Sequence, residues 1–347
     1  MATIKTKHAI AGAVLGVMSG FGMMVALAFS PIALLPTIII SLLGIWAGLP
    51  SALVATASNL FVAYSLGGGI LALVVIETMI IPAWCVIALI ARRTRYYDGI
   101  KQSVFMQCGA LFVLVVGARL AIGEDIVEYL MNSLRGAINS YPEEYVQMFV
   151  AYMGQAGLFG SQTGLDFTQA IPSEQLTALL DAFFAAYTTE LNRSLVSMLL
   201  TTGVVTGAAS YGLSAFIVSR RGDDPIIDYA HPCDWRLSPS LIIGPPACAL
   251  IFYIAYNMGT RGADSAYLAM YSLCVLLFMA QGAGAVDRWF RKTGATKSIR
   301  LFIIAVLVIT GLRNLLAIAG VISALGGSEG LISKAIKKHN DKGDGTF

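Results

Sequence analysis

Residues 69–91, GILALVVIETMIIPAWCVIALIA, decide the fold of this chain, because they form an almost purely apolar run. Glu77 is the one charged side chain among them. A helix needs about 20 mostly apolar residues to cross about 30 Å of hydrocarbon. The run is long enough, and Arg92, Arg93 and Arg95 follow it directly. An apolar run that ends in basic residues predicts a transmembrane helix whose C-terminal end faces the cytoplasm.

The composition of all 347 residues agrees with this local reading. Apolar residues make up 57% of the chain and charged residues 12%, whereas soluble domains carry about 25%. Too few charges remain to cover a water-facing surface, so the sequence predicts an integral membrane protein in contact with the lipid bilayer. The net charge of +3 gives no electrostatic reason to expect a nucleic-acid partner.

Similar apolar runs recur along the chain and predict an all-α, polytopic bundle of about nine transmembrane helices, with eight possible. We expect five helices in residues 1–122, a helical extracytoplasmic insertion at 123–190, four helices in 191–325 and a polar tail at 326–347. The predicted spans are 8–29, 32–48, 50–66, 69–91, 102–122, 192–218, 239–258, 264–287 and 299–323.

The orientation follows from lysines and arginines in short loops. Basic residues cluster after the fourth run and again between the last two, at Arg288, Arg291, Lys292, Lys297 and Arg300. Segment 123–190 has nine acidic residues and only Arg135 as a basic one. A cytoplasmic N-terminus places both basic loops inside and the acidic segment outside. Nine crossings then leave a tail with four lysines outside, so either the tail is an exception or one short run does not cross.

Helical spacing also recurs inside the predicted insertion. Apolar residues follow this spacing in 125–138 and again after Pro172-Ser173-Glu174, which is typical of a helix start. These helices either lie on the outer membrane surface or cap the bundle, or they form a lid over a binding site.

The sequence gives no sign of catalysis. It has none of the short motifs of zinc proteases, serine hydrolases or phosphate-binding loops, and its three histidines lie at or beyond the membrane boundaries. The five cysteines are scattered rather than paired or clustered. We therefore predict no catalytic residue, no resident metal and no cofactor, and expect that the protein is not an enzyme.

Polar residues inside the apolar runs are the strongest functional signal, because an unpaired charge at that depth costs several kcal/mol. With the orientation above, all of them fall in the outer half of the bilayer. They predict either a structural Glu–Arg pair or a polar cavity for a small ligand, whose surplus positive charge favours an anion. The candidate ligand-binding residues are Asn59, Glu77, Arg119, Arg313 and Asn314.

Small residues predict close helix packing at the N-terminus. Gly12, Gly16 and Gly20 share one face of the first run, and Gly203 and Gly207 repeat the spacing. Such a face packs within the monomer or docks a second membrane subunit. Gln281, in the inner half of the eighth span, is expected to form an interhelical hydrogen bond.

Short segments of the chain resemble the YybS-like family of bacterial membrane proteins. The resemblance rests on Trp235–Pro239, Phe278–Val286 and Ala319–Ile322, and on Leu35-Pro36, Gly48–Ala52 and Pro82-Ala83 nearer the N-terminus. That family looks related to the substrate-binding S components of energy-coupling-factor vitamin transporters. The resemblance implies a bacterial cytoplasmic membrane, an outward-facing ligand pocket, and docking of a coupling subunit on the first helix.

These observations predict a small-molecule binding or transport component of the membrane. The alternative is a structural or scaffolding protein that organises partner proteins or its own copies without a ligand. A membrane-embedded enzyme is the third possibility. An enclosed polar cavity around Glu77 and Arg313 would favour transport, and direct pairing of the two would favour a scaffold.

Overall fold

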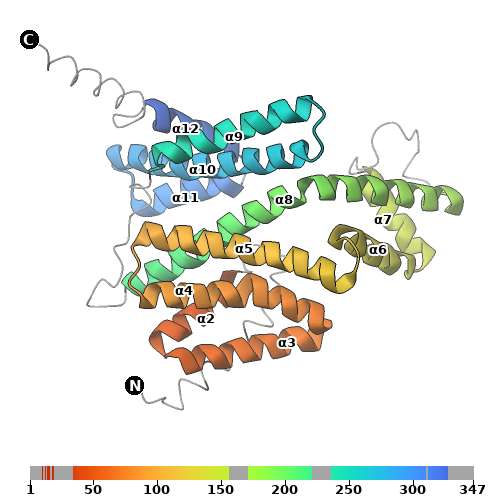
Figure 1. Cartoon of the computed structure of the whole chain (residues 1–347), viewed down its shortest axis with the longest axis horizontal. Coiled ribbons are helices and arrows are strands. Elements are labelled where there is room, and N and C mark those ends of the chain that lie inside the picture. The colour runs from red at the N-terminus through yellow and green to blue at the C-terminus, as the bar shows by residue number, and fades with distance from the viewer. Residues whose placement is uncertain are drawn as a thin grey trace, which may run out of the picture. The chain divides into compact units, whose positions relative to one another are not determined.

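The computed structural model describes residues 34–155, 171–220, 236–309 and 312–326, together with residues 10, 12, 14, 15 and 18. Within these residues all regular secondary structure is helical, which confirms the all-α prediction (Figure 1). The chain forms two compact units. Unit 1 comprises Met1–Leu114 and Ser197–Phe347, and unit 2 comprises Val115–Val196. Unit 2 includes the predicted insertion, while the two predicted bundles belong together in unit 1.

The N-terminal part of unit 1 consists of α2 (Leu34–Trp46), α3 (Leu49–Val75), a π-helical segment η2 (Ile76–Ile80) and α4 (Ile81–Ala91). Two glycines in the left-handed region shape it: Gly48 between α2 and α3 (φ 92°) and Gly68 within α3 (φ 64°). The Trp84 indole N–H donates to the Thr56 hydroxyl over 3.2 Å. This bond, and the shared apolar core below, show that the predicted spans 50–66 and 69–91 pack against each other. The core comprises Ile40, Ala52, Ala55, Ala63, Val75, Met79, Ile80, Ala83 and Ile87.

Helices α5 (Tyr96–Ile122) and α8 (Ser173–Ser219) pack antiparallel where both belong to unit 1. The Ser103 hydroxyl donates to the Gly207 carbonyl over 2.9 Å. A Cβ atom on Gly207 would lie 2.7 Å from the Val104 Cα, and one on Gly203 would lie 3.1 Å from the Cys108 Cα. The glycine spacing noted in the sequence therefore serves close packing within the chain at these two positions.

The C-terminal part of unit 1 consists of α9 (Pro239–Asn257), α10 (Ala263–Lys292), α11 (Lys297–Ile309) and α12 (Arg313–Gly326). Helices α10 and α12 cross in backbone contact, because Gly282 lies against the Leu316 carbonyl and Gly320 against the Phe278 carbonyl. Three residues after Gly320, Ser323 accepts a hydrogen bond from Arg288. Gly282 and Gly320 mark the crossing point, and beyond it toward both C-termini Arg288 reaches Ser323, so α12 runs in the same direction as α10.

The prediction of one ninth span at 299–323 is wrong. Within this stretch the structure describes two helices, α11 of 13 residues and α12 of 14 residues, each about 20 Å long at 1.5 Å per residue. Helix α12 ends near the end of α10 at which α11 begins (Figure 1). Helices α11 and α12 therefore form a hairpin, and neither arm reaches the 30 Å or so that a crossing requires.

Unit 2 consists of α6 (Ile126–Asn139), α7 (Glu143–Gln155) and the adjoining parts of α5 and α8. The Asp125 carboxylate caps α6 by accepting from the Val127 N–H over 2.9 Å. The helix predicted over 125–138 and the helix start predicted at Pro172-Ser173-Glu174 are both confirmed. Helix α7 is an element that the spacing analysis missed. The unit has a core of its own, formed by Val127, Met131, Ile138, Val146, Val150, Ile171, Leu176, Leu180, Phe183 and Phe184.

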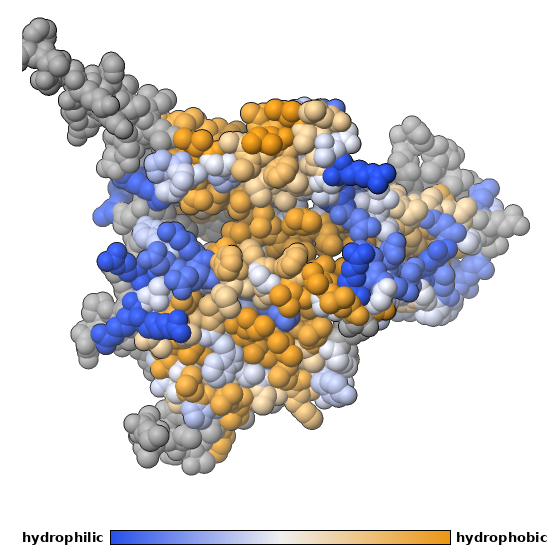
Figure 2. Space-filling model, in the orientation of Figure 1, coloured by the Kyte–Doolittle hydropathy of each residue, from blue (hydrophilic) through white to orange (hydrophobic). Residues whose placement is uncertain are grey.

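Six helical segments of the described chain are long and apolar enough to cross a membrane, while α2 and α12 are shorter. Apolar side chains cover much of the visible surface (Figure 2). Phe61, Phe105 and Phe112 lie on the predicted spans and are each at least 67% exposed. Apolar surface of this extent is suited to lipid rather than to water, and the protein is a membrane protein. The predicted first span, 8–29, lies almost wholly outside the described residues.

Candidate functional site

Glu77 lies in the core of the N-terminal helices, inside the π-helical segment η2. The residue is 8% exposed, and its Oε2 atom is buried without a hydrogen-bond partner among the described residues. Ionisable side chains at membrane depth are costly and are most often part of a substrate, ion or proton pathway. Glu77 is therefore the residue of the predicted set for which the structure makes the strongest functional case.

The backbone around Glu77 is irregular. The wider turns of η2 end at Ile80, two residues before Pro82, which lacks the N–H that would continue the helical ladder. Short π-helical segments inside α-helices occur frequently at functional sites. The sequence signal for this irregularity is Pro82 within an otherwise continuous apolar run.

Asn59 lies on the antiparallel partner of the Glu77 segment. It is 1% exposed, and its side-chain amide donates to the Ala55 carbonyl over 3.0 Å. The Trp84–Thr56 hydrogen bond sets the register of the two antiparallel segments. Glu77 is seven residues before Trp84, so the residue opposite Glu77 is about seven residues after Thr56, at Ala63. Asn59 is then about one helical turn from the level of Glu77. The α3–α4 pair thus brings two of the five predicted residues to similar depths.

The other three predicted residues lie on other helices, Arg119 on α5 and Arg313 and Asn314 on α12. Arg119 is exposed and belongs to unit 2, whereas Asn59 and Glu77 belong to unit 1. Arg313 is the first residue of α12, at the turn of the hairpin, and its side chain lies outside the described residues. Asn314, next to it, is exposed. The pairing of Glu77 with Arg313, and the cavity around them, stay predictions.

A second polar group lies where α10 packs on α12, and we call it the hairpin cluster. Gln281 accepts a hydrogen bond from the Leu237 backbone N–H over 2.9 Å and donates to the Ser323 hydroxyl over 3.5 Å. The interhelical role predicted for Gln281 is confirmed. The same hydroxyl accepts from Arg288 over 3.1 Å, so one serine links two positions on α10. The hairpin cluster comprises Gln281, Asp287, Arg288, Arg300 and Ser323.

Asp287 and Arg300 form a buried ion pair within the hairpin cluster. The Arg300 Nη1 atom lies 3.2 Å from the Asp287 Oδ1 atom, and the two side chains are 11% and 5% exposed. The sequence analysis counted Arg300 as a loop charge, which is wrong, because the residue lies in the first turn of α11. The pair joins α10 to α11 and thereby anchors the base of the hairpin.

We expect Asp287→Asn and Arg300→Gln each to lower the thermal stability of the detergent-solubilised protein, since each leaves a buried charge without its ionic partner. The double variant should lose less than the sum, with an interaction energy of about 0.5–3 kcal/mol. The Lys101–Asp98 pair is the control, because its side chains are 72% and 51% exposed and contribute at most about 1 kcal/mol. Additive losses at Asp287 and Arg300 would contradict the pairing.

The proposed docking face of the first helix is visible at one position. A Cβ atom on Gly12 would lie 2.9 Å from the Ser51 carbonyl oxygen, so this glycine packs closely on α3 of the same chain. Gly16 and Gly20 lie outside the described residues. At Gly12, packing within the monomer is what the structure shows.

Comparison of the chain with protein-family models, curated proteins and solved structures finds no match. The site must therefore be interpreted from its own chemistry. Among the described residues, no group of three or more histidine, cysteine or acidic side chains could hold a metal ion. Asp223, Asp224, Asp228 and Asp234, in the predicted loop between the sixth and seventh spans, lie outside those residues.

Proposed function

We propose that the protein is a small-molecule binding or transport component of the membrane, with Glu77 and Asn59 in its ligand site. The observation that carries the proposal is the buried Oε2 atom of Glu77, which has no hydrogen-bond partner among the described residues. A carboxyl group held this way can accept a hydrogen bond from a ligand or exchange a proton with it. A residue that served packing alone would be an apolar one, because apolar side chains avoid the cost of burying a charge.

The proposal keeps the transport prediction and refines its site. The irregular η2 backbone around Glu77 and the buried amide of Asn59, about one helical turn away along the packed helices, support this site. The YybS-like resemblance supports the same class of function, with a bacterial cytoplasmic membrane, a cytoplasmic N-terminus and a coupling subunit as its further expectations. We also propose that the ligand is an anion. This part of the proposal requires that Arg313 contributes its positive charge to the site.

We expect a lipid-soluble carbodiimide, which modifies carboxyl groups in apolar surroundings, to label the purified protein at Glu77. Peptide mass spectrometry identifies the site, and Glu77→Gln should abolish the adduct. Asp287 is a matched control, since it is also buried but pairs with Arg300, and it should remain unmodified. Equal labelling of the two carboxyl groups, or none at Glu77, would argue against a distinct chemistry at Glu77.

The ligand itself is tested by comparing small molecules that co-purify with the wild type, with Glu77→Gln and with Asn59→Ala. A compound bound at the proposed site should be lost or strongly reduced in both variants. The same set of compounds in all three preparations would contradict the proposed site.

A scaffolding role is the second candidate, and one surface of unit 2 favours it. Met148 and Tyr152 lie four residues apart on α7 and are 69% and 72% exposed. Large apolar side chains exposed along one helix face are typical of protein contacts. Stoichiometric proteins that co-purify with the wild type and are lost on Met148→Ser would support this role instead.

A further inference from the structure

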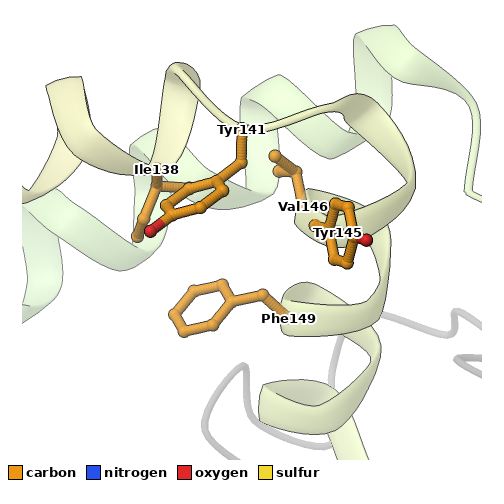
Figure 3. Close-up of a pocket in the computed structure, with 5 residues that line it drawn as sticks. All are labelled: Ile138, Tyr141, Tyr145, Val146 and Phe149. Atoms are coloured by element: carbon orange, nitrogen blue, oxygen red, sulfur yellow. The ribbon is translucent and has the colours of Figure 1, made fainter.

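Unit 2 contains a pocket of about 230 Å³ between the end of α6 and the first turns of α7 (Figure 3). Drug-sized ligands occupy pockets of about 300–1,000 Å³, so this one suits a smaller molecule. In Figure 3, Tyr141 and Phe149 lie on either side of a gap next to Val146. The lining is almost wholly apolar and consists of Ile138, Tyr141, Tyr145, Val146 and Phe149.

The local sequence explains why three aromatic rings line this pocket. Tyr145 and Phe149 lie four residues apart on one side of α7, and Tyr141 lies in the turn just before this helix. The turn before α7 is fixed by hydrogen bonds, with the Tyr141 N–H donating to the Ile138 carbonyl over 3.1 Å and the Tyr145 N–H donating to the Pro142 carbonyl over 2.9 Å.

The pocket has a buried floor and exposed walls. Ile138 and Val146 belong to the core of unit 2 and are 9% and 8% exposed. Tyr141 and Tyr145 are 62% and 60% exposed, so their rings are available to a molecule that enters from water. A ligand seated on the floor would contact aromatic rings without displacing any of the core.

The charge of unit 2 selects among possible ligands. Val115–Val196 contains nine acidic residues and three arginines, so its net charge is 3 − 9 = −6. Two of the arginines pair within the unit, Arg135 with Asp181 and Arg193 with Glu190. Glu143 and Glu144, between Tyr141 and Tyr145, are exposed. The surrounding field therefore attracts cations and repels anions.

We propose that this pocket binds a small organic cation of the quaternary ammonium class. An aromatic ring attracts a cation over its face, and quaternary ammonium groups bind in pockets lined by several such rings. Their methyl groups need no hydrogen-bond acceptors, which the apolar lining does not offer. An ammonium ion or a metal ion would lose its hydration there without replacement. The site is separate from Glu77 and does not depend on the function proposed above.

The test is isothermal titration of the full-length protein in detergent with choline, with tetramethylammonium and with 3,3-dimethylbutan-1-ol. The last compound has the shape of choline but no charge. We expect both cations to bind, and the neutral compound to bind at least about fivefold more weakly, as a cation–π contribution of about 1 kcal/mol or more implies. Equal binding of choline and its neutral counterpart, or no cation binding at millimolar concentrations, would overturn the proposal.

Variants locate the site. Tyr141→Leu and Phe149→Leu keep an apolar side chain but remove a ring, and each should raise the Kd for choline about fivefold or more. Tyr141→Phe keeps the ring and should bind choline like the wild type. Tyr152→Leu is the matched control, because Tyr152 is exposed on α7 but does not line the pocket. Unchanged affinity in folded Tyr141→Leu and Phe149→Leu would place the site elsewhere and refute the proposal.

Two further measurements ask whether the natural cation is a lipid headgroup or a free solute, and whether choline binds at this pocket or near Glu77. Weaker choline binding in phosphatidylcholine nanodiscs than in phosphatidylglycerol nanodiscs would identify a lipid headgroup as the natural source of the cation. Equal binding in the two would identify a free solute. Both results require that the pocket binds the cation. Choline should bind Glu77→Gln as it binds the wild type. Loss of binding in that variant would show that choline occupies the membrane site and not this pocket.

Discussion

A cysteine introduced at Ser328 is expected to react with a membrane-impermeant maleimide from the same side of the membrane as a cysteine introduced at Thr296. Thr296 lies between α10 and α11, and Ser328 follows α12 by two residues. Helices α11 and α12 are each about 20 Å long, too short to cross the hydrocarbon, and α12 runs parallel to α10. The chain should therefore enter the membrane after Thr296 and leave it on the same side.

The labelling is done on intact cells in a background without the five native cysteines, with gel-shift detection before and after permeabilisation. Ser140→Cys, in unit 2, is the reference for the opposite side. A single ninth crossing would place Ser328 with Ser140. Such a result would show that α11 and α12 together cross the bilayer.

The hairpin also removes the conflict in the charge pattern. If the predicted spans 8–29 and 32–48 cross together with the six long helices, the chain has eight crossings and both termini lie on one side. Lys334, Lys337, Lys338 and Lys342 then lie on the side of the loop at 293–296 and of Arg92 and Arg93. All the lysine- and arginine-rich segments would obey the positive-inside rule.

Replacing Gly282 with alanine is expected to destabilise unit 1 strongly. A Cβ atom at this position would overlap the Leu316 carbonyl oxygen and lie 3.0 Å from the Gly320 backbone nitrogen. The obstacle is backbone rather than the end of a flexible side chain, so α10 and α12 must move apart. Overpacking of this kind costs about 1–3 kcal/mol, occasionally more. The measurement is the thermal midpoint of the detergent-solubilised protein, followed by fluorescence.

Gly320→Ala should show a loss of similar size, since a Cβ atom there would overlap the Phe278 carbonyl oxygen. Gly109→Ala is the matched control. Gly109 is also inside a predicted span, but nothing lies within 4 Å of the Cβ atom it would gain, and alanine favours helix more than glycine does. A midpoint as high in Gly282→Ala as in Gly109→Ala would show that the two backbones are not in contact.

Much of the membrane architecture could be predicted from the sequence, because apolar run length has a direct physical meaning in a bilayer. The runs at 50–66, 69–91, 102–122, 192–218, 239–258 and 264–287 all correspond to long apolar helical segments. The helix over 125–138 was predictable from its apolar spacing, and the start of α8 from Pro172-Ser173-Glu174. Glu77 stood out because a charge in an apolar run is rare.

Other features depend on contacts that hydropathy does not record. The run 299–323 is apolar apart from Arg300, Thr310, Arg313, Asn314 and Ser323, and these few polar residues did not suggest two separate helices. Asp287 and Arg300 resemble loop charges until their helices are packed together. Helix α7 was detectable, since Val146, Phe149, Val150 and Met153 follow helical spacing after Pro142-Glu143, but this signal was overlooked. The predicted arginine surplus near Glu77 stays a prediction, because depth along a helix does not by itself fix the distance between helices.

Helix α8 has a mechanical consequence. It runs as one hydrogen-bonded helix of 47 residues, about 70 Å, from Ser173 in unit 2 to Ser219 in unit 1. An unbroken helix resists twisting far more than a loop does. Any rotation of α8 about its own axis would therefore turn Gly203 and Gly207, where α5 packs on the backbone with almost no clearance. Within unit 1, the contact between α5 and α8 would oppose such a rotation by steric clash.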